Sequence, residues 1–248
     1  MATVGVFDSG SGGLSVLREI RKLLPDDRFV YYSDNASCPY GDKSPEFVTA
    51  RSRDITDFLI SRGAQAVVVA CNTATAAAIG TLRSLYDIPF IGMEPAIKPA
   101  VSASRSGVVG VLATAGTLKA SKYLDTKRRC GTSVRIVEGV GRGFVELVET
   151  LELDGPRAES IVREAVGPML SAGADIIVLG CTHYPFLLPL LRRIAPPEVS
   201  FYDPAPAVAR RLREVLQERG ISLGEPHPHT ELHASGPDDT LKKLFSII

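Results

Sequence analysis

Residues 63–75 read GAQAVVVACNTAT, and residues 173–185 read GADIIVLGCTHYP. Each stretch begins with a Gly-Ala pair, continues as a short apolar run and reaches a cysteine that is followed by polar side chains. An unbroken apolar run of this length is typical of a strand buried on both faces, as in parallel sheets. We therefore predict two equivalent strands, with Cys71 and Cys181 just past their carboxyl ends, where open parallel sheets place their ligand sites.

Two further pairs of segments extend this similarity into an internal repeat. Residues 4–6 (VGV) match residues 109–111 (VGV), and Phe90 with the later Pro95-Ala96 matches Phe201 with the later Pro206-Ala207. The three matches occur in the same order, at offsets of 105, 110 and 111 residues. An ordered repeat of this kind predicts two similar halves.

Short runs rich in Val and Ile alternate with amphipathic segments along the chain, which predicts parallel strands joined by helices and an α/β fold. The predicted strands cover residues 3–7, 29–33, 66–70, 90–92, 108–112, 134–137, 176–179 and 199–202. The predicted helices cover residues 14–24, 46–60, 75–85, 160–170 and 207–218.

The composition excludes several classes of function. Lys and Arg total 28 and Asp and Glu total 28 among 248 residues, so no net charge attracts nucleic acid or a membrane surface. No apolar run approaches the ~20 residues of a membrane span. We expect a cytoplasmic protein that acts on a small polar metabolite, and the sequence is compatible with a homodimer. The four cysteines lack CxxC spacing, so they predict neither a disulfide framework nor a metal site.

The segments around the two repeated cysteines carry the chemistry. Short polar residues after Cys71 open a helix, whose N–H groups can hold a carboxylate and whose N-terminus lowers a thiol pKa from its free value of about 8.5. Cys181 has His183 two residues further on, an imidazole that could share its proton. A lone buried cysteine is more often a small hydrophobic side chain, but its repetition favours a function.

Two polar loops are expected at the same edge of the sheet. Residues 7–14 (FDSGSGGL) follow the first strand, and their spacing matches neither a P-loop nor GxGxxG, which disfavours phosphate binding. Asp8 in this loop either caps the next helix or exchanges a proton, and the sequence leaves both roles open. Residues 34–41 (DNASCPYG) form the second loop, which is rich in turn-forming residues.

Two equivalent thiols suit one reaction in particular. Inversion of a stereocentre by proton transfer requires a base on one face and an acid on the other, and thiolate and thiol exchange these roles when the reaction reverses. Asp8 and His183 are the candidate helpers. A two-lobed protein that binds a carboxylate without transforming it is the alternative from another class, but titratable thiols at both equivalent points favour an enzyme.

The sequence resembles the glutamate racemases of the aspartate/glutamate racemase superfamily, from Gly5 to about Arg211. The resemblance implies two similar α/β domains with largely parallel central sheets, related by a pseudo-two-fold axis, with the active site in the cleft. These domains would span residues 1–97 plus 208–248 and residues 98–207. The motifs that carry the resemblance are residues 6–13 (VFDSGSGG), 39–44 (PYGDKS), 70–74 (ACNTA), 92–95 (GMEP), 110–114 (GVLAT) and 180–185 (GCTHYP).

The resemblance also implies interconversion of L- and D-glutamate without cofactor or metal, which supplies D-glutamate for peptidoglycan synthesis. Cys71 would take the α-proton from D-glutamate while Cys181 protonates the other face, with the roles exchanged for L-glutamate. Asp8 would assist Cys71, His183 would assist Cys181, and Glu149 fits the family's active-site glutamate. The implied substrate-binding residues are Asp8, Ser9, Tyr40, Gly41, Asn72, Thr73, Thr114, Thr117, Thr182 and His183.

The choice of substrate stays open at this point. Racemisation of aspartate, a hydantoin or another acidic amino acid by the same mechanism is the alternative, because the sequence does not place the loops that set side-chain reach.

Overall fold

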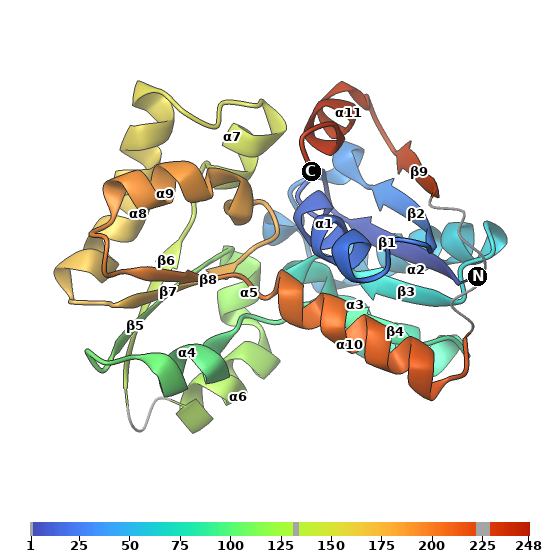
Figure 1. Ribbon diagram of the computed structural model, residues 1–248, viewed down its shortest axis with the longest axis horizontal. Coiled ribbons are helices and arrows are strands. Elements are labelled where there is room, and N and C mark those ends of the chain that lie inside the picture. Colours follow the sequence, from blue (N-terminus) through green and yellow to red (C-terminus); the bar gives the residue numbers. More distant parts are fainter. Residues whose placement is uncertain (1, 131–133, 222–228) are drawn as a thin grey trace. The chain divides into compact units, whose positions relative to one another are not determined.

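The computed structural model describes residues 2–130, 134–221 and 229–248 (Figure 1). The chain divides into two compact units, which we call unit 1 (Met1–Met93 with Ala205–Ile248) and unit 2 (Glu94–Pro204). The domain limits predicted from the sequence, at 97/98 and 207/208, stay a prediction. None of the helices in the described residues is both long and apolar enough to cross a membrane.

Unit 1 is built on a five-stranded parallel sheet in the order β4-β3-β1-β2-β9. Helices α2 and α3 cover the sheet face whose core includes Phe7, Val67 and Val69, while α1 packs against α10. The strands are β1 (Thr3–Asp8), β2 (Arg28–Ser33), β3 (Ala66–Val69), β4 (Phe90–Gly92) and β9 (His229–Ala234). The helices are α1 (Leu14–Leu23), η1 (Asn35–Ser37), η2 (Tyr40–Asp42), α2 (Pro45–Ser61), α3 (Asn72–Leu85), α10 (Ala205–Glu218) and α11 (Asp239–Phe245).

Unit 2 contains a four-stranded parallel sheet in the order β6-β5-β7-β8. Its core includes Val109, Val111 and Val178, which pack with Ile97 and Ala100 of α4. The strands are β5 (Val108–Ala113), β6 (Arg135–Val140), β7 (Ile176–Gly180) and β8 (Ser200–Tyr202). The helices are α4 (Ile97–Ala103), α5 (Ala115–Lys119), α6 (Ser121–Cys130), α7 (Phe144–Glu149), α8 (Pro156–Ser171), η3 (Tyr184–Leu187) and α9 (Leu188–Ile194).

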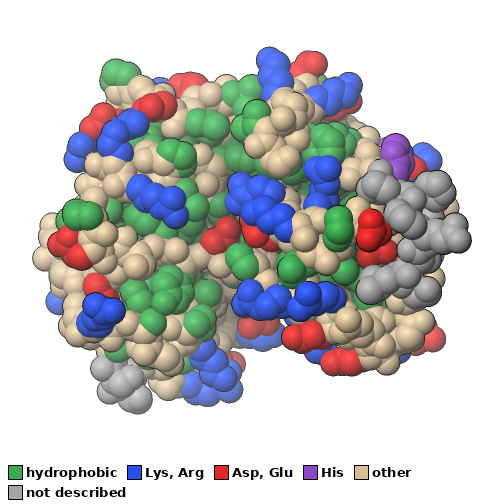
Figure 2. Space-filling view, in the orientation of Figure 1, with side chains coloured by type: hydrophobic (Ala, Val, Ile, Leu, Met, Phe, Trp, Pro, Cys, Tyr) green, Lys and Arg blue, Asp and Glu red, His purple; other side chains and the backbone are tan. Residues whose placement is uncertain are grey.

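The predicted α/β fold with two sheets of parallel strands is therefore confirmed. Every strand and helix predicted from the sequence is present, with ends that differ by at most four residues. Basic and acidic side chains are interspersed on the face shown in Figure 2, in keeping with the equal numbers of the two kinds.

The internal repeat is also confirmed, because both sheets share one strand order. β2-β1-β3-β4 in unit 1 corresponds to β6-β5-β7-β8 in unit 2. The third strand of each set lies beside the first, with Phe7 paired to Val69 in unit 1 and Ala113 paired to Gly180 in unit 2. The chain leaves the first strand toward one neighbour and reaches the third strand on the other side, which makes this point the switch point of each sheet.

The Gly-Ala pairs of the repeat end helices α2 and α8 in the same way. Gly63 has a φ of 88° and Gly173 a φ of 83°, in the left-handed region that glycine adopts most easily. The N–H of the following alanine donates to the carbonyl of Leu59 in unit 1 and of Met169 in unit 2. This cap closes each helix and turns the chain into the strand that precedes a cysteine.

The two units of the repeat exchange one pair of equivalent helices. The helix that follows the fourth strand belongs to the other unit in each case: α4 follows β4 but lies in unit 2, and α10 follows β8 but lies in unit 1. Unit 2 is therefore a continuous segment of chain, and unit 1 is not.

Candidate active site

Cys71 lies between the end of β3 and the first turn of α3. Its Sγ accepts a hydrogen bond from the N–H of Ala74 at 3.4 Å, and the thiol donates to Oγ of Ser9 at 3.8 Å. The side chain is only 6% exposed. An N–H donor at a helix N-terminus favours the thiolate over the thiol. Cys71 thus lies where the sequence predicted, and its surroundings there favour a negatively charged sulfur.

Asp8 is the last residue of β1 and is fully buried. Its Oδ2 accepts hydrogen bonds from the N–H of Gly13 at 2.9 Å and of Gly10 at 3.3 Å. A Cβ at Gly13 would lie 2.7 Å from Cβ of Asp8, so the turn closes tightly only around glycine. The carboxylate therefore holds the turn before α1, but it does not cap this helix, whose N-cap is Gly13 without a side-chain hydrogen bond. Proton exchange by Asp8 stays a prediction.

Tyr40 is buried in η2, and its hydroxyl donates to Oδ2 of Asp34 at 2.6 Å. Arg51 of α2 donates to both oxygens of the same carboxylate. Burial acts to raise the pKa of Asp34, but the hydrogen bonds from Arg51 and Tyr40 outweigh it and hold this pKa below its ordinary value. Burial and the contact with Asp34 raise the pKa of Tyr40 far above its ordinary range. Asp34 is therefore ionised and Tyr40 is protonated near neutral pH.

Asn72 is the first residue of α3 and is 4% exposed. Neither its Oδ1 nor its Nδ2 has a hydrogen-bond partner among the described residues. A buried polar group without a partner costs about 1–3 kcal/mol, so the Asn72 amide is open to a partner such as a ligand or a water molecule. Thr73, the next residue, is also buried, and Gly41 follows Tyr40 in η2.

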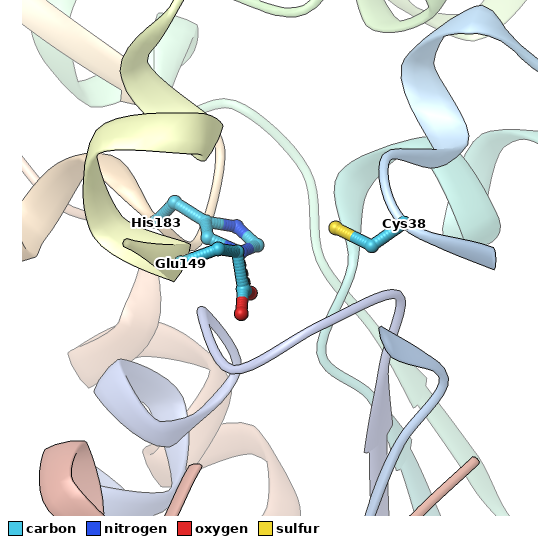
Figure 3. Close-up of side chains that lie close together, drawn as sticks. All are labelled: Cys38, Glu149 and His183. Atoms are coloured by element: carbon cyan, nitrogen blue, oxygen red, sulfur yellow. Dashed lines mark hydrogen bonds and ion pairs between the residues drawn. The ribbon is translucent and has the colours of Figure 1, made fainter. Parts of the chain in front are cut away.

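In unit 2, Cys181 follows β7 and is 8% exposed. Its Sγ lies 3.8 Å from Nδ1 of His183, whose Nε2 lies 2.8 Å from Oε1 of Glu149 at the end of α7. Figure 3 shows the imidazole and the carboxylate pointing toward one another; Cys38, also drawn there, belongs to unit 1. The structure thus brings together three residues of unit 2 that the sequence singled out.

This order of groups can move a proton. A carboxylate beside Nε2 favours the tautomer with a proton on Nε2, which leaves the Nδ1 lone pair to accept the proton of the Cys181 thiol. Glu149 then stabilises the charge that His183 gains. The arrangement can pass a proton from the sulfur to the imidazole and, in reverse, return it to the sulfur.

The surroundings of Cys181 differ from those of Cys71. The N–H of Tyr184 donates to the backbone carbonyl of Cys181 at 3.2 Å, and the segment that follows is the short helix η3. The sequence placed the two cysteines at equivalent points, and the structure agrees for the strands. A helix N-cap supports the sulfur in unit 1, whereas an imidazole supports it in unit 2.

Three threonines complete this edge of unit 2. Thr114 follows β5 and caps α5, with its Oγ1 accepting the N–H of Thr117 at 3.2 Å and lying 3.0 Å from the Thr117 hydroxyl. Thr182, beside Cys181, is buried. The sequence placed Asp34 in a polar, turn-rich loop at the same edge of unit 1 without giving it a role and did not single out Arg51, and the structure pairs these two residues.

Residues 5–212 match the model of a protein family described as Asp/Glu/Hydantoin racemase. The chain belongs to this family. The predicted family and the prediction of a racemase are therefore confirmed. A glutamate racemase of Pseudomonas entomophila (strain L48) is 46% identical over 248 residues, which cover 100% of this chain and 94% of that protein.

Solved structures of the family have the same fold. A glutamate racemase isoform from Bacillus anthracis superposes with a TM-score of 0.88 at 31% identity, covering 98% of this chain and 92% of that chain. A glutamate racemase from Escherichia coli, in complex with L-glutamate and the activator UDP-MurNAc-ala, superposes with a TM-score of 0.87 at 34% identity, covering 99% and 94%.

Proposed function

We propose that this member of the racemase family interconverts L-glutamate and D-glutamate by a two-base mechanism that uses Cys71 and Cys181 and no cofactor. The observation that carries the proposal is the equivalence of the two thiols: each follows the third strand of its sheet, and each sulfur has its own hydrogen-bonding support, a helix N–H for Cys71 and an imidazole for Cys181. A reaction that inverts a stereocentre uses two such groups in opposite protonation states.

The proton balance is simple. With D-glutamate, the Cys71 thiolate removes the α-proton and becomes a thiol, while the Cys181 thiol gives its proton to the opposite face of the carbanion and becomes a thiolate. When L-glutamate dissociates, Cys71 is a thiol and Cys181 is a thiolate, which are the protonation states that the reverse reaction requires. Exchange of the sulfur-bound proton with water restores the first state.

The supporting residues follow from their contacts. His183 and Glu149 assist Cys181, since they form a hydrogen-bonded chain that ends at its sulfur. We assign Asp8 to Cys71 because the two residues stand at the carboxyl ends of the neighbouring strands β1 and β3 of unit 1. The amide of Asn72, which has no partner among the described residues, binds the substrate. The other proposed binding residues are Ser9, Tyr40, Gly41, Thr73, Thr114, Thr117 and Thr182.

Glutamate is the proposed substrate because the relatives at 46% identity over the full length, and the solved structures with TM-scores near 0.9, are glutamate racemases. We infer that the product D-glutamate enters peptidoglycan synthesis and that the enzyme works in the cytoplasm, alone or as a homodimer. Racemisation of aspartate is the second candidate, since the family description includes it.

The experiment is an exchange assay in deuterium oxide with purified protein and no added cofactor. We expect wild-type protein to racemise either glutamate enantiomer and to incorporate deuterium at the α-carbon. Cys71→Ala and Cys181→Ala should each abolish racemisation, while Cys130→Ala, at the end of α6, should match the wild type. Full activity in either active-site variant would refute the two-base mechanism, and turnover of aspartate alone would refute the substrate.

A further inference from the structure

We propose that Arg51 is a positioning residue. It acts through Asp34 and so orients the Tyr40 hydroxyl group for substrate binding. The inference rests on the proposed function, which assigns Tyr40 to substrate binding. Arg51 itself lies on α2, and its hydrogen bonds go to protein carboxylates.

The contact between Arg51 and Asp34 is a two-pronged ion pair. Nε of Arg51 donates to Oδ2 of Asp34 at 3.0 Å, and Nη2 donates to Oδ1 at 2.8 Å. The Asp34 side chain is fully buried, while that of Arg51 is 28% exposed. Two parallel N–H···O bonds fix the plane of a carboxylate as well as its charge. Arg51 therefore determines how the Asp34 oxygens are oriented inside the unit.

The charge matters because Asp34 is buried. Without a cation beside it, a buried carboxyl group favours its neutral form, which can donate a proton as well as accept one. With Arg51 in place, Asp34 only accepts. The Tyr40 hydroxyl proton is then committed to Asp34, and the Tyr40 oxygen offers only lone pairs to any other group. A substrate group that meets this oxygen must be a donor, such as an ammonium group.

Tyr40 lies close to the candidate site, so the orientation of its hydroxyl group affects that site. Tyr40 packs in the same buried cluster as Cys71, at the carboxyl edge of the sheet. The backbone N–H of Asp34 donates to the carbonyl of Asp8 at 3.0 Å, which anchors Asp34 to the end of β1. Arg51 thus ties α2, through Asp34, to the segment that carries Tyr40 and Gly41.

The kinetic test uses Arg51→Met, Arg51→Lys and Asp54→Asn. Asp54 is a matched control because it is the other carboxylate bound by Arg51, at 3.2 Å from Nη1, and it is 65% exposed. We expect Arg51→Met to raise KM for both glutamate enantiomers by about tenfold, with kcat changed less than threefold. Arg51→Lys keeps the positive charge but cannot form the two-pronged contact with Asp34, so its KM should lie between those of Arg51→Met and the wild type. Asp54→Asn should match the wild type.

A second variant separates positioning from folding. Arg51→Met leaves a buried carboxylate unpaired, whereas Arg51→Met combined with Asp34→Asn does not. We expect the double variant to regain thermal stability and to keep the raised KM, because the two-pronged contact of Arg51 is still missing. Wild-type KM in folded Arg51→Met, or a KM that returns to normal together with stability, would overturn the proposal.

A third measurement needs no catalytic activity, so it keeps the inference testable even if glutamate is not the substrate. Unfolding midpoints of Arg51→Met, Tyr40→Phe and the combined variant form a double-mutant cycle. If Arg51 acts on Tyr40 through Asp34, the midpoint shifts are not additive. Additive shifts would overturn the coupling, while absence of glutamate turnover in the wild type would overturn only the proposed function.

Discussion

The thiol of Cys71 caps helix α3, where its Sγ accepts the N–H of Ala74 at 3.4 Å. A cap and a base make different demands on this side chain, because serine is a good cap but a far weaker base at neutral pH. We expect Cys71→Ser to keep the thermal stability of the wild type and to lower kcat at least ~100-fold. Cys71→Ala should lose activity and also about 1 kcal/mol of stability. Thermal unfolding and racemisation rates check both, and an active Cys71→Ser variant would contradict the assignment.

Glu149→Gln tests the chain of groups behind Cys181. Glutamine retains the size of Glu149 but cannot balance the charge on His183, so we expect racemisation to fall by ~10–100-fold. The equilibrium constant between enantiomers is one, so kcat/KM must fall equally in both directions. The proposed difference between the two thiols should instead appear in the kinetic isotope effect. This effect should grow more for α-deuterated L-glutamate, from which Cys181 is proposed to remove the α-proton, than for α-deuterated D-glutamate.

Glu146→Gln is the control for this prediction. Glu146 lies on the same helix, α7, but is exposed. Its variant should therefore retain wild-type rates, and an equal loss in both variants would indicate a general effect of charge on α7.

Gly13→Ala should disturb the turn that holds Asp8. A Cβ at this position would lie 2.7 Å from Cβ of Asp8 and 2.8 Å from the Tyr31 hydroxyl oxygen. We expect a loss of about 1–3 kcal/mol in urea unfolding together with reduced activity. Gly80→Ala, inside α3 with open space around the added methyl group, should instead stabilise the protein by about 0.5–1 kcal/mol. A neutral Gly13→Ala would show that the turn tolerates a side chain.

Asp175 predicts a dependence of stability on pH. Burial would raise its pKa, but hydrogen bonds from the Ser104 hydroxyl and from the N–H groups of Arg105 and Ser106 outweigh it and lower the pKa to about 2. Because the pKa is depressed in the folded state, the stabilisation is present above the ordinary pKa of 3.8 and is lost as the pH falls through about 2.

Asp175→Asn should therefore lower the free energy of unfolding by about 1–2 kcal/mol at neutral pH. The difference from the wild type should shrink between pH 3.8 and about 2. Denaturant titrations across this range measure it, and a difference that does not depend on pH would contradict the role of the charge.

The central strands β1, β3, β5 and β7 could be predicted because they are buried on both faces and are apolar runs rich in Val and Ile. Strand β9 could not, since HTELHA is polar and lies at the edge of its sheet, where β2 is its one neighbour among the described strands. The short helices α4 and α9 were also missed. Each contains a proline and has only seven residues, too few for an amphipathic period to emerge.

The two cysteines could be predicted as a pair because the repeat marks them. Asp34 and Arg51 could not, because their pairing depends on how α2 packs against the loop after β2, and an arginine on an amphipathic helix is usually solvated. Glu149 came from the family resemblance alone. Periodicity does not distinguish it from Glu146, and only the packing of α7 beside η3 places its carboxylate at His183.

The exchange of α4 and α10 between the units sets the order in which the chain can be completed on the ribosome. Unit 2 is a single stretch, residues 94–204, and has all its elements once β8 has emerged. Unit 1 begins earlier but ends later, because α10, which packs against α1, the edge strand β9 and helix α11 are synthesised after unit 2. Domains usually fold in the order of their synthesis. The N-terminal sheet of this protein therefore stays incomplete until the whole of unit 2 has been translated, and only then acquires α10, β9 and α11.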